Sequence, residues 1–189
     1  MYERDGPPQG EQRWQMSYDS IAVANYLIER ARQRGEMLTP MKVQKLVYFA
    51  HGWNLAINDQ PLLRERIEAW KYGPVVPALY EELREFGSRP IPAPVEVMRV
   101  DANRLAVLQP TLDAADGDTT AAKELLDRVW DVYGHYSAVQ LSNATHAPGS
   151  PWDVTWQGAA GASHAVIDDD LIKMDFLRRA AKAAAPAPV

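Results

Sequence analysis

Residues 68–80 read Glu68-Ala69-Trp70-Lys71-Tyr72-Gly73-Pro74-Val75-Val76-Pro77-Ala78-Leu79-Tyr80, an aromatic-rich segment that runs through a Gly-Pro pair into a helical pattern. Gly73 can adopt a positive φ, and Pro74 fixes φ and has no amide hydrogen, so the extended segment is expected to end sharply here. Pro77 suits the first turn of a helix, where a missing N–H costs nothing. The apolar residues that continue at helical spacing are Val76, Leu79, Tyr80, Leu83 and Phe86. Gly87 is expected to end this helix.

The aromatic residues before this bend can face the core or a partner. Alternation along an extended segment would place Trp70 and Tyr72 on one face and Lys71 on the other. We expect Trp70 to pack as a core residue beside the turn, and Lys71 and Tyr72 to be partly exposed. An amphipathic ring next to a rigid turn suits a surface that binds another protein.

Length, charge and cysteine content limit the functions that this chain can have. With 189 residues, 47% of them hydrophobic, the chain is expected to form one domain with a substantial core. The formal net charge of −5 argues against a nucleic-acid partner. The absence of cysteine excludes disulfides and thiolate chemistry and favours a cytoplasmic location. No apolar run approaches the roughly 20 residues that span a membrane, and residues 1–15 do not resemble a signal peptide.

The ends of the chain have a different composition from the middle. Residues 1–17 are polar and rich in glycine and proline, and are expected to be a flexible leader. Residues 179–189 end in an alanine-proline segment and are expected to be a disordered tail. The folded domain is therefore expected to span residues 18–178.

Two helices are predicted before the bend. The first is capped by Asp19 or Ser17 and ended by Gly35. The second begins at Thr39-Pro40, and its apolar stripe comprises Val43, Leu46, Val47, Ala50, Trp53 and Ile57. The polar residues expected to lie off that stripe are Lys42, Gln44, Lys45 and Asn54. The mid-helix Gly52 indicates that another element packs closely against it.

After the bend, residues 95–100 and 104–108 are expected to pair as a hairpin, and three more helices follow. They are predicted over residues 122–133, over 138–145 with Ser137 as cap, and from Asp168 to about Lys182. The predicted fold is mainly α: a single compact domain of about six helices with a small β-hairpin or short extended element.

The sequence contains few residue patterns that indicate catalysis. His51, His135, His146 and Asp153 could converge as zinc ligands from three segments, so a metal-dependent hydrolase remains an alternative, but no His-Glu-x-x-His spacing supports it. The favoured role for His51 is a hydrogen-bonded structural histidine. No nucleophile elbow and no nucleotide-binding glycine motif is present. We predict no enzyme activity, no catalytic residue, no metal site and no cofactor.

Aromatic and semi-polar residues are concentrated in the chain, which has six tryptophans and eight tyrosines. Most are expected to fill the core, and a subset is expected to form a docking surface for another protein. The predicted contact residues are Lys71, Tyr72, Gly73, Val75, His135, Tyr136 and Trp152.

Four stretches together carry a family likeness: residues 38–53 (LTPMKVQKLVYFAHGW), 67–77 (IEAWKYGPVVP), 129–137 (VWDVYGHYS) and 150–152 (SPW). In this order and at these separations they resemble the Panacea antitoxin domain, a phage- and mobile-element-associated family that includes SocA-like antitoxins. The resemblance spans residues 18–153 and is weakest over 90–120.

The resemblance implies a mostly helical domain that neutralises a cognate protein toxin by direct binding. The SocA-like branch is also known as an adaptor that hands its toxin to the ClpXP protease, so proteolytic delivery is the alternative to simple blocking. The bend at residues 70–74 and the corner at residues 134–137 are expected to meet in space and face the partner.

Overall fold

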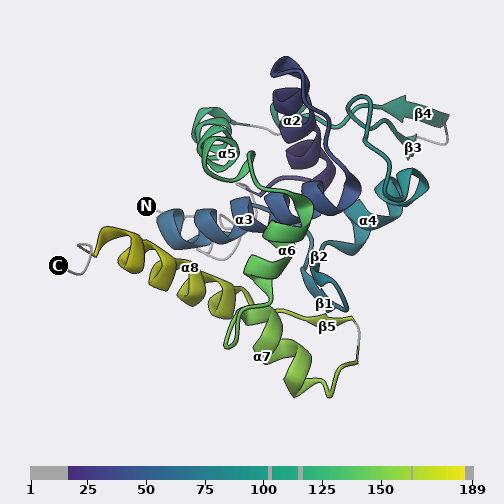
Figure 1. Ribbon diagram of the computed structural model, residues 1–189. Coiled ribbons are helices and arrows are strands. Elements are labelled where there is room, and N and C mark those ends of the chain that lie inside the picture. The colour runs from purple at the N-terminus through teal and green to yellow at the C-terminus, as the bar shows by residue number, and fades with distance from the viewer. Residues whose placement is uncertain (1–16, 102–103, 115–116, 163, 186–189) are drawn as a thin grey trace, which may run out of the picture.

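The computed structural model describes residues 17–101, 104–114, 117–162 and 164–185, and its architecture is mainly α-helical (Figure 1). The α-helices of this part of the chain are α2 (Ser20–Gln33), α3 (Pro40–Asn58), α4 (Pro77–Leu83), α5 (Thr120–Tyr133), α6 (Ala138–Thr145), α7 (Pro151–Gly158) and α8 (Asp169–Ala184). Two 3₁₀ turns accompany them, η1 (Arg84–Phe86) and η2 (Leu112–Ala114). Of these helices α7 was not predicted, although Ser150 caps it and Pro151 occupies its first turn.

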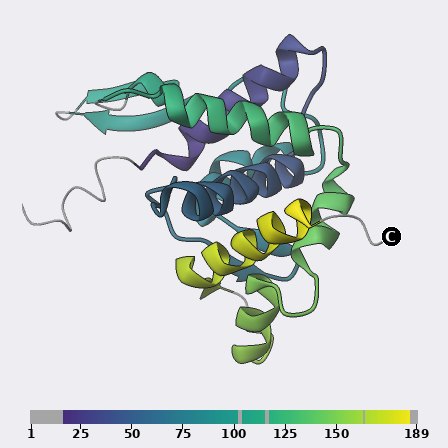
Figure 2. The ribbon, with the colours of Figure 1, turned by 90° about the vertical axis from the view of Figure 1, so that its left-hand side faces the viewer.

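Two small antiparallel sheets complete the fold. In the first, β1 (Glu68–Trp70) pairs with β2 (Gly73–Val75) on one edge and with β5 (Ala165–Val166) on the other. The second is the predicted hairpin of β3 (Val97–Asp101) and β4 (Arg104–Leu108), which projects from the helical body (Figure 2). The predicted alternation of residues 70–72 was wrong, because Lys71 and Tyr72 form the turn between β1 and β2.

The middle of the molecule is α3. It contacts α2, α4, α5, α6, α8 and β2, and in Figure 1 it runs between α2 and α5 on one side and α8 on the other. Every residue from Val43 to Gly52 is consequently buried. The prediction that Gln44, Lys45 and Asn54 would lie off the buried stripe is corrected, because the middle of α3 has neighbours all round. Ile57, predicted to lie on the stripe, is 61% exposed near the end of the helix.

The packing of α8 on α3 explains two residues of the central helix. A Cβ added at Gly52 would lie 2.2–2.5 Å from three ring atoms of Phe176, so glycine lets that ring pack against the α3 backbone. The Nδ1 of His51 accepts from the Leu63 amide at 3.3 Å, which leaves Nε2 to donate to Asp169 at 3.1 Å. The predicted close contact at Gly52 and the predicted structural role of His51 are therefore confirmed.

The segment that carries the β3–β4 hairpin is attached to α2 by one buried side chain. The Asn25 carbonyl oxygen accepts from the Val95 amide at 2.7 Å, and its amide group donates to the carbonyls of Val95 and Pro110 at 2.9 and 3.0 Å. These bonds hold the chain on both sides of the hairpin at a single point.

The expected domain boundaries shift at both ends. Ser17 was assigned to the leader, but it is buried, and its carbonyl accepts from the Arg64 guanidinium at 2.9 Å. The expected tail from residue 179 begins inside α8, where Arg179 pairs with Asp175 at 2.7 Å and donates to the Ala144 carbonyl at 3.1 Å. Residues 1–16 and 186–189 lie outside the described residues. None of the described helices is both long and apolar enough to cross a bilayer.

Candidate functional site

The turn between β1 and β2 presents an aromatic ring to solvent. Tyr72 is 63% exposed, and the Lys71 ammonium lies 5.4 Å from its ring centroid. The backbone on both sides is fixed, since the Trp152 indole N–H donates to the Trp70 carbonyl at 2.7 Å and the Ser142 hydroxyl donates to the Tyr72 carbonyl at 3.3 Å. The ring is therefore presented by a rigid support.

Glycine is required directly after this turn. Gly73 has φ +102°, a conformation that L side chains rarely adopt. A Cβ there would lie 2.6 Å from the Lys45 amine and 2.9 Å from the Thr145 hydroxyl oxygen. The missing side chain lets the β2 backbone settle over Lys45, whose Nζ donates to the Pro74 carbonyl at 2.9 Å.

Burial of Lys45 changes its protonation. The residue is only 1% exposed, and loss of solvation lowers the pKa of its amine from 10.5 to about 7. Its neighbour Lys42, which is less buried, has a pKa that burial also lowers. At neutral pH the Lys45 amine is thus close to its titration midpoint, in contrast to an ordinary surface lysine.

The buried side chains of Gln44 and Glu68 hold the segments around the bend. Gln44 accepts from the Val76 amide at 3.0 Å and donates to the Val76 carbonyl at 3.2 Å, which fixes the start of α4 to α3. Burial raises the pKa of Glu68, but hydrogen bonds from Trp70 and His164 and the charge of Arg66 outweigh it, so the net shift is downward.

The predicted second corner lies at the junction of α5 and α6. Lys42 donates to the Gly134 carbonyl at 2.5 Å, and the ring centroids of His135 and Tyr136 are 4.1 Å apart. Ser137 forms a capping box with Gln140 at the start of α6. These contacts hold the backbone of the corner in place.

The two corners are joined indirectly. Ser137 caps α6, and Ser142, which contacts the bend, follows five residues later, about 8 Å along the helix axis. Lys42 holds the corner, while the adjacent Met41 lines a pocket with Tyr72. Both corners therefore flank the first turns of α3.

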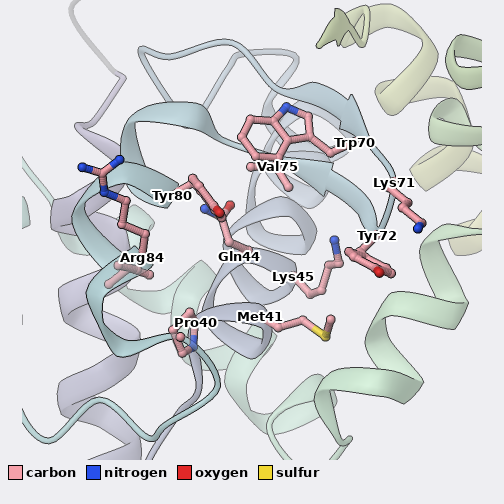
Figure 3. A pocket seen from close by; sticks show the side chains of 12 residues that line it. Pro40, Met41, Gln44, Lys45, Trp70, Lys71, Tyr72, Val75, Tyr80 and Arg84 are labelled. Carbon is pink, nitrogen blue, oxygen red and sulfur yellow. The ribbon is translucent and has the colours of Figure 1, made fainter. Parts of the chain in front are cut away.

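A pocket opens beside the bend (Figure 3). Its volume is about 390 Å³. Its lining comes from the start of α3, from the β1–β2 hairpin and from α4 and η1, and comprises Pro40, Met41, Gln44, Lys45, Trp70, Lys71, Tyr72, Val75, Tyr80, Leu83, Arg84 and Gly87. Figure 3 shows Lys71 and Arg84 on opposite sides of the pocket, with Lys45 between them.

The seven predicted contact residues divide by exposure. Lys71, Tyr72, His135 and Tyr136 are exposed. Gly73 and Val75 are buried under the bend, with Val75 in the pocket wall. Trp152 is 9% exposed, because its ring lies between His146 and Trp156 and its N–H is bonded to Trp70. These three residues support the surface from beneath.

The residues considered as zinc ligands do not converge. His51 is bonded to Leu63 and Asp169, whereas His146 donates to the Ser142 carbonyl at 2.6 Å. His135 packs on Tyr136, and Asp153 accepts from the Gly149 amide at 2.8 Å. Nowhere in the described part of the chain do three or more histidine, cysteine, aspartate or glutamate side chains gather closely enough to hold a metal ion.

Sequence reasoning missed most of the pocket. Gln44 and Lys45 are predicted only as positions off the apolar stripe of the helix, and Met41 and Arg84 carry no predicted role. One signal was present: Lys45 stands inside the run Val43-Gln44-Lys45-Leu46-Val47, where a lysine is unusual if the helix is buried all round. Recognising it requires knowing how many neighbours α3 has, and only the tertiary structure shows them.

The comparisons with known proteins agree with one another. A family model described as "Antitoxin SocA-like, Panacea domain" matches residues 43–153. The chain is 34% identical over 142 residues to Antitoxin SocA of Caulobacter vibrioides (strain NA1000 / CB15N), an alignment that covers 75% of this chain and 72% of that protein. No solved structure matches.

Proposed function

This chain belongs to the family of SocA-like antitoxins with a Panacea domain, and from that membership we propose that it neutralises a cognate protein toxin by binding it directly. The contact surface is formed by the exposed side chains of the two corners, Lys71 and Tyr72 at the bend and His135 and Tyr136 before α6. The toxin is held in an inactive state by occlusion.

The observation that carries this proposal is the exposure of Tyr72 on a rigid support. Large aromatic side chains with fixed backbones are the residues that dominate binding energy at protein interfaces, since little conformational entropy is lost when they are covered. The ring is 63% exposed, while the carbonyls of Trp70 and Tyr72 are held by Trp152 and Ser142.

The proposal is tested first in cells. The reading frame adjacent to this gene is expressed alone and together with this chain, and we expect growth arrest in the first case and rescue in the second. Purified together, the two proteins should form a complex. If the adjacent product is harmless alone, or toxic with and without this chain, the proposed function does not hold for that pair.

Replacing Tyr72 with alanine should weaken toxin binding without unfolding the antitoxin. Loss of a central aromatic anchor costs about 2 kcal/mol, or roughly 30-fold in Kd. A solvent-exposed substitution changes the free energy of unfolding by only about 0.5 kcal/mol. Calorimetric titration of the complex and a thermal melt of the free antitoxin measure the two quantities.

Met174→Ala on α8 is the matched control, because Met174 is a large, exposed apolar residue away from both corners. It should leave Kd unchanged. A large fall in Tm for Tyr72→Ala would instead show that the ring stabilises the fold. Delivery to a protease is distinguished by repeating the rescue in cells lacking ClpXP: occlusion predicts that rescue persists, and delivery predicts that the toxin stays active.

A further inference from the structure

The pocket beside the bend differs in charge from the rest of the chain. Three of its lining residues carry basic side chains, Lys45, Lys71 and Arg84, and its lining includes no aspartate or glutamate. The whole chain, in contrast, has a formal net charge of −5. Arg84 pairs with Glu81 at 2.7 Å, but both side chains are exposed, and exposed pairs are worth little.

The cation at the base of the pocket has unused donors. A lysine ammonium has three N–H donors, and among the described residues the structure gives Lys45 one acceptor, the Pro74 carbonyl. A buried ammonium with one neutral acceptor is destabilising, and a carboxylate that shared the site would offset that cost.

The walls between the cations are apolar and aromatic. Tyr72 and Tyr80 are exposed, the Trp70 and Tyr80 ring centroids are 4.8 Å apart, and Met41 of α3 also lines the pocket. A volume of about 390 Å³ is sufficient for one or two side chains of a partner.

Building on the proposed function, we propose that this pocket receives an acidic segment of the toxin. One aspartate or glutamate side chain reaches Lys45, a neighbouring large apolar side chain packs between Tyr72 and Tyr80, and further carboxylates meet Lys71 and Arg84 at the two edges. Charge complementarity selects this occupant, because an apolar segment would leave the Lys45 amine unpaired and a basic segment would be repelled by all three cations.

The test uses a probe that does not require the toxin. The probe is a blocked pentapeptide of alternating glutamate and phenylalanine, and its matched control carries glutamine in place of each glutamate. Binding to the ¹⁵N-labelled protein is followed by NMR. We expect the acidic peptide to shift the lining residues and to bind about tenfold more tightly than the control, the effect of one charge-assisted hydrogen bond.

Three variants test which residues produce the preference for the acidic peptide. Lys45→Met should abolish the preference for the acidic peptide, and Lys71→Met combined with Arg84→Met, both exposed, should reduce it while leaving the fold intact. Lys173→Met on α8, which removes an ion pair with Asp59 far from the pocket, should not alter it. Equal affinity for the two peptides, shifts outside the pocket, or no binding of either peptide would overturn the inference.

This outcome is independent of the cell experiment. Rescue of toxicity with no acidic preference in the pocket would leave the antitoxin function standing and remove the acidic anchor. A preference for the acidic peptide without rescue would leave the acidic binding by the pocket standing and remove the antitoxin function for that pair.

Discussion

Gly52→Ala is expected to destabilise the protein by about 3 kcal/mol, which lowers Tm by roughly 6–12 °C in a chain of this size. The new Cβ would lie 2.2–2.5 Å from three atoms of the Phe176 ring. That ring cannot move aside, because it is fully buried and makes edge contacts with Tyr48, Phe49 and Trp53. The gain of about 1 kcal/mol in helix propensity does not offset this overlap. Urea denaturation measures the difference.

Gly158→Ala is the matched control for this prediction. Gly158 is the last residue of α7, and a Cβ there meets nothing within 4 Å, so the substitution should change stability by no more than about 0.5 kcal/mol. Adding Phe176→Leu to Gly52→Ala should recover part of the loss, since two contacting substitutions are not additive. If Gly52→Ala left stability unchanged, the packing of α8 on α3 would have to differ from the one described here.

Lys45→Met is expected to stabilise the protein at pH 6–7 by about 1–3 kcal/mol and to alter its dependence on pH. The pKa of the amine is lowered by burial to about 7 in the folded state, against 10.5 unperturbed. Between these values the unfolded chain binds a proton that the folded chain lacks, so stability of the native protein rises with pH by up to about 1.4 kcal/mol per unit. Below pH 7 both states are protonated and the full cost of burying the charge remains.

The advantage of Lys45→Met should therefore shrink as pH rises from 7 to 9. Urea denaturation of both proteins at each pH gives the difference, and Lys42, which titrates in both, cancels from it. Lys173→Met, at an ion pair with Asp59 on the surface, serves as control and should show no such trend. If the free energies of unfolding of the native protein and of Lys45→Met changed with pH in parallel, the Lys45 amine would not be the titrating group.

Together these predictions separate stability from binding. Met at position 45 should make a more stable protein that has lost its preference for an acidic partner, which is the behaviour of a buried charge retained for function. Tyr72→Ala should do the reverse, weakening binding at little cost to the fold.

Local patterns were sufficient for much of the fold. The predicted helices over α2 and α6 followed from caps and apolar spacing, and the helix over α5 followed from apolar spacing alone. The pairing of residues 95–100 with 104–108 was also predicted. The missed helix α7 carried the same kind of signal, a serine cap before proline, so its omission was an error of reading and not a limit of the sequence.

The candidate site could be predicted from the sequence only in part. Exposure of Lys71 and Tyr72 agreed with expectation, although the reason was a hairpin turn and not strand alternation. Burial of Trp152 depends on a hydrogen bond to Trp70, 82 residues away. No local pattern reports such a contact.

By itself the sequence determined a mainly helical domain, the position of the bend and the family, because caps, prolines, glycines and four ordered motifs act over a few residues each. Only the tertiary structure decided that α3 is surrounded, that Lys45 lies beneath Gly73, and that cations and aromatic rings from three elements line one pocket. Burial, and the pKa that follows from it, depends on which distant segments exclude water from a side chain, and that arrangement exists only in the folded chain.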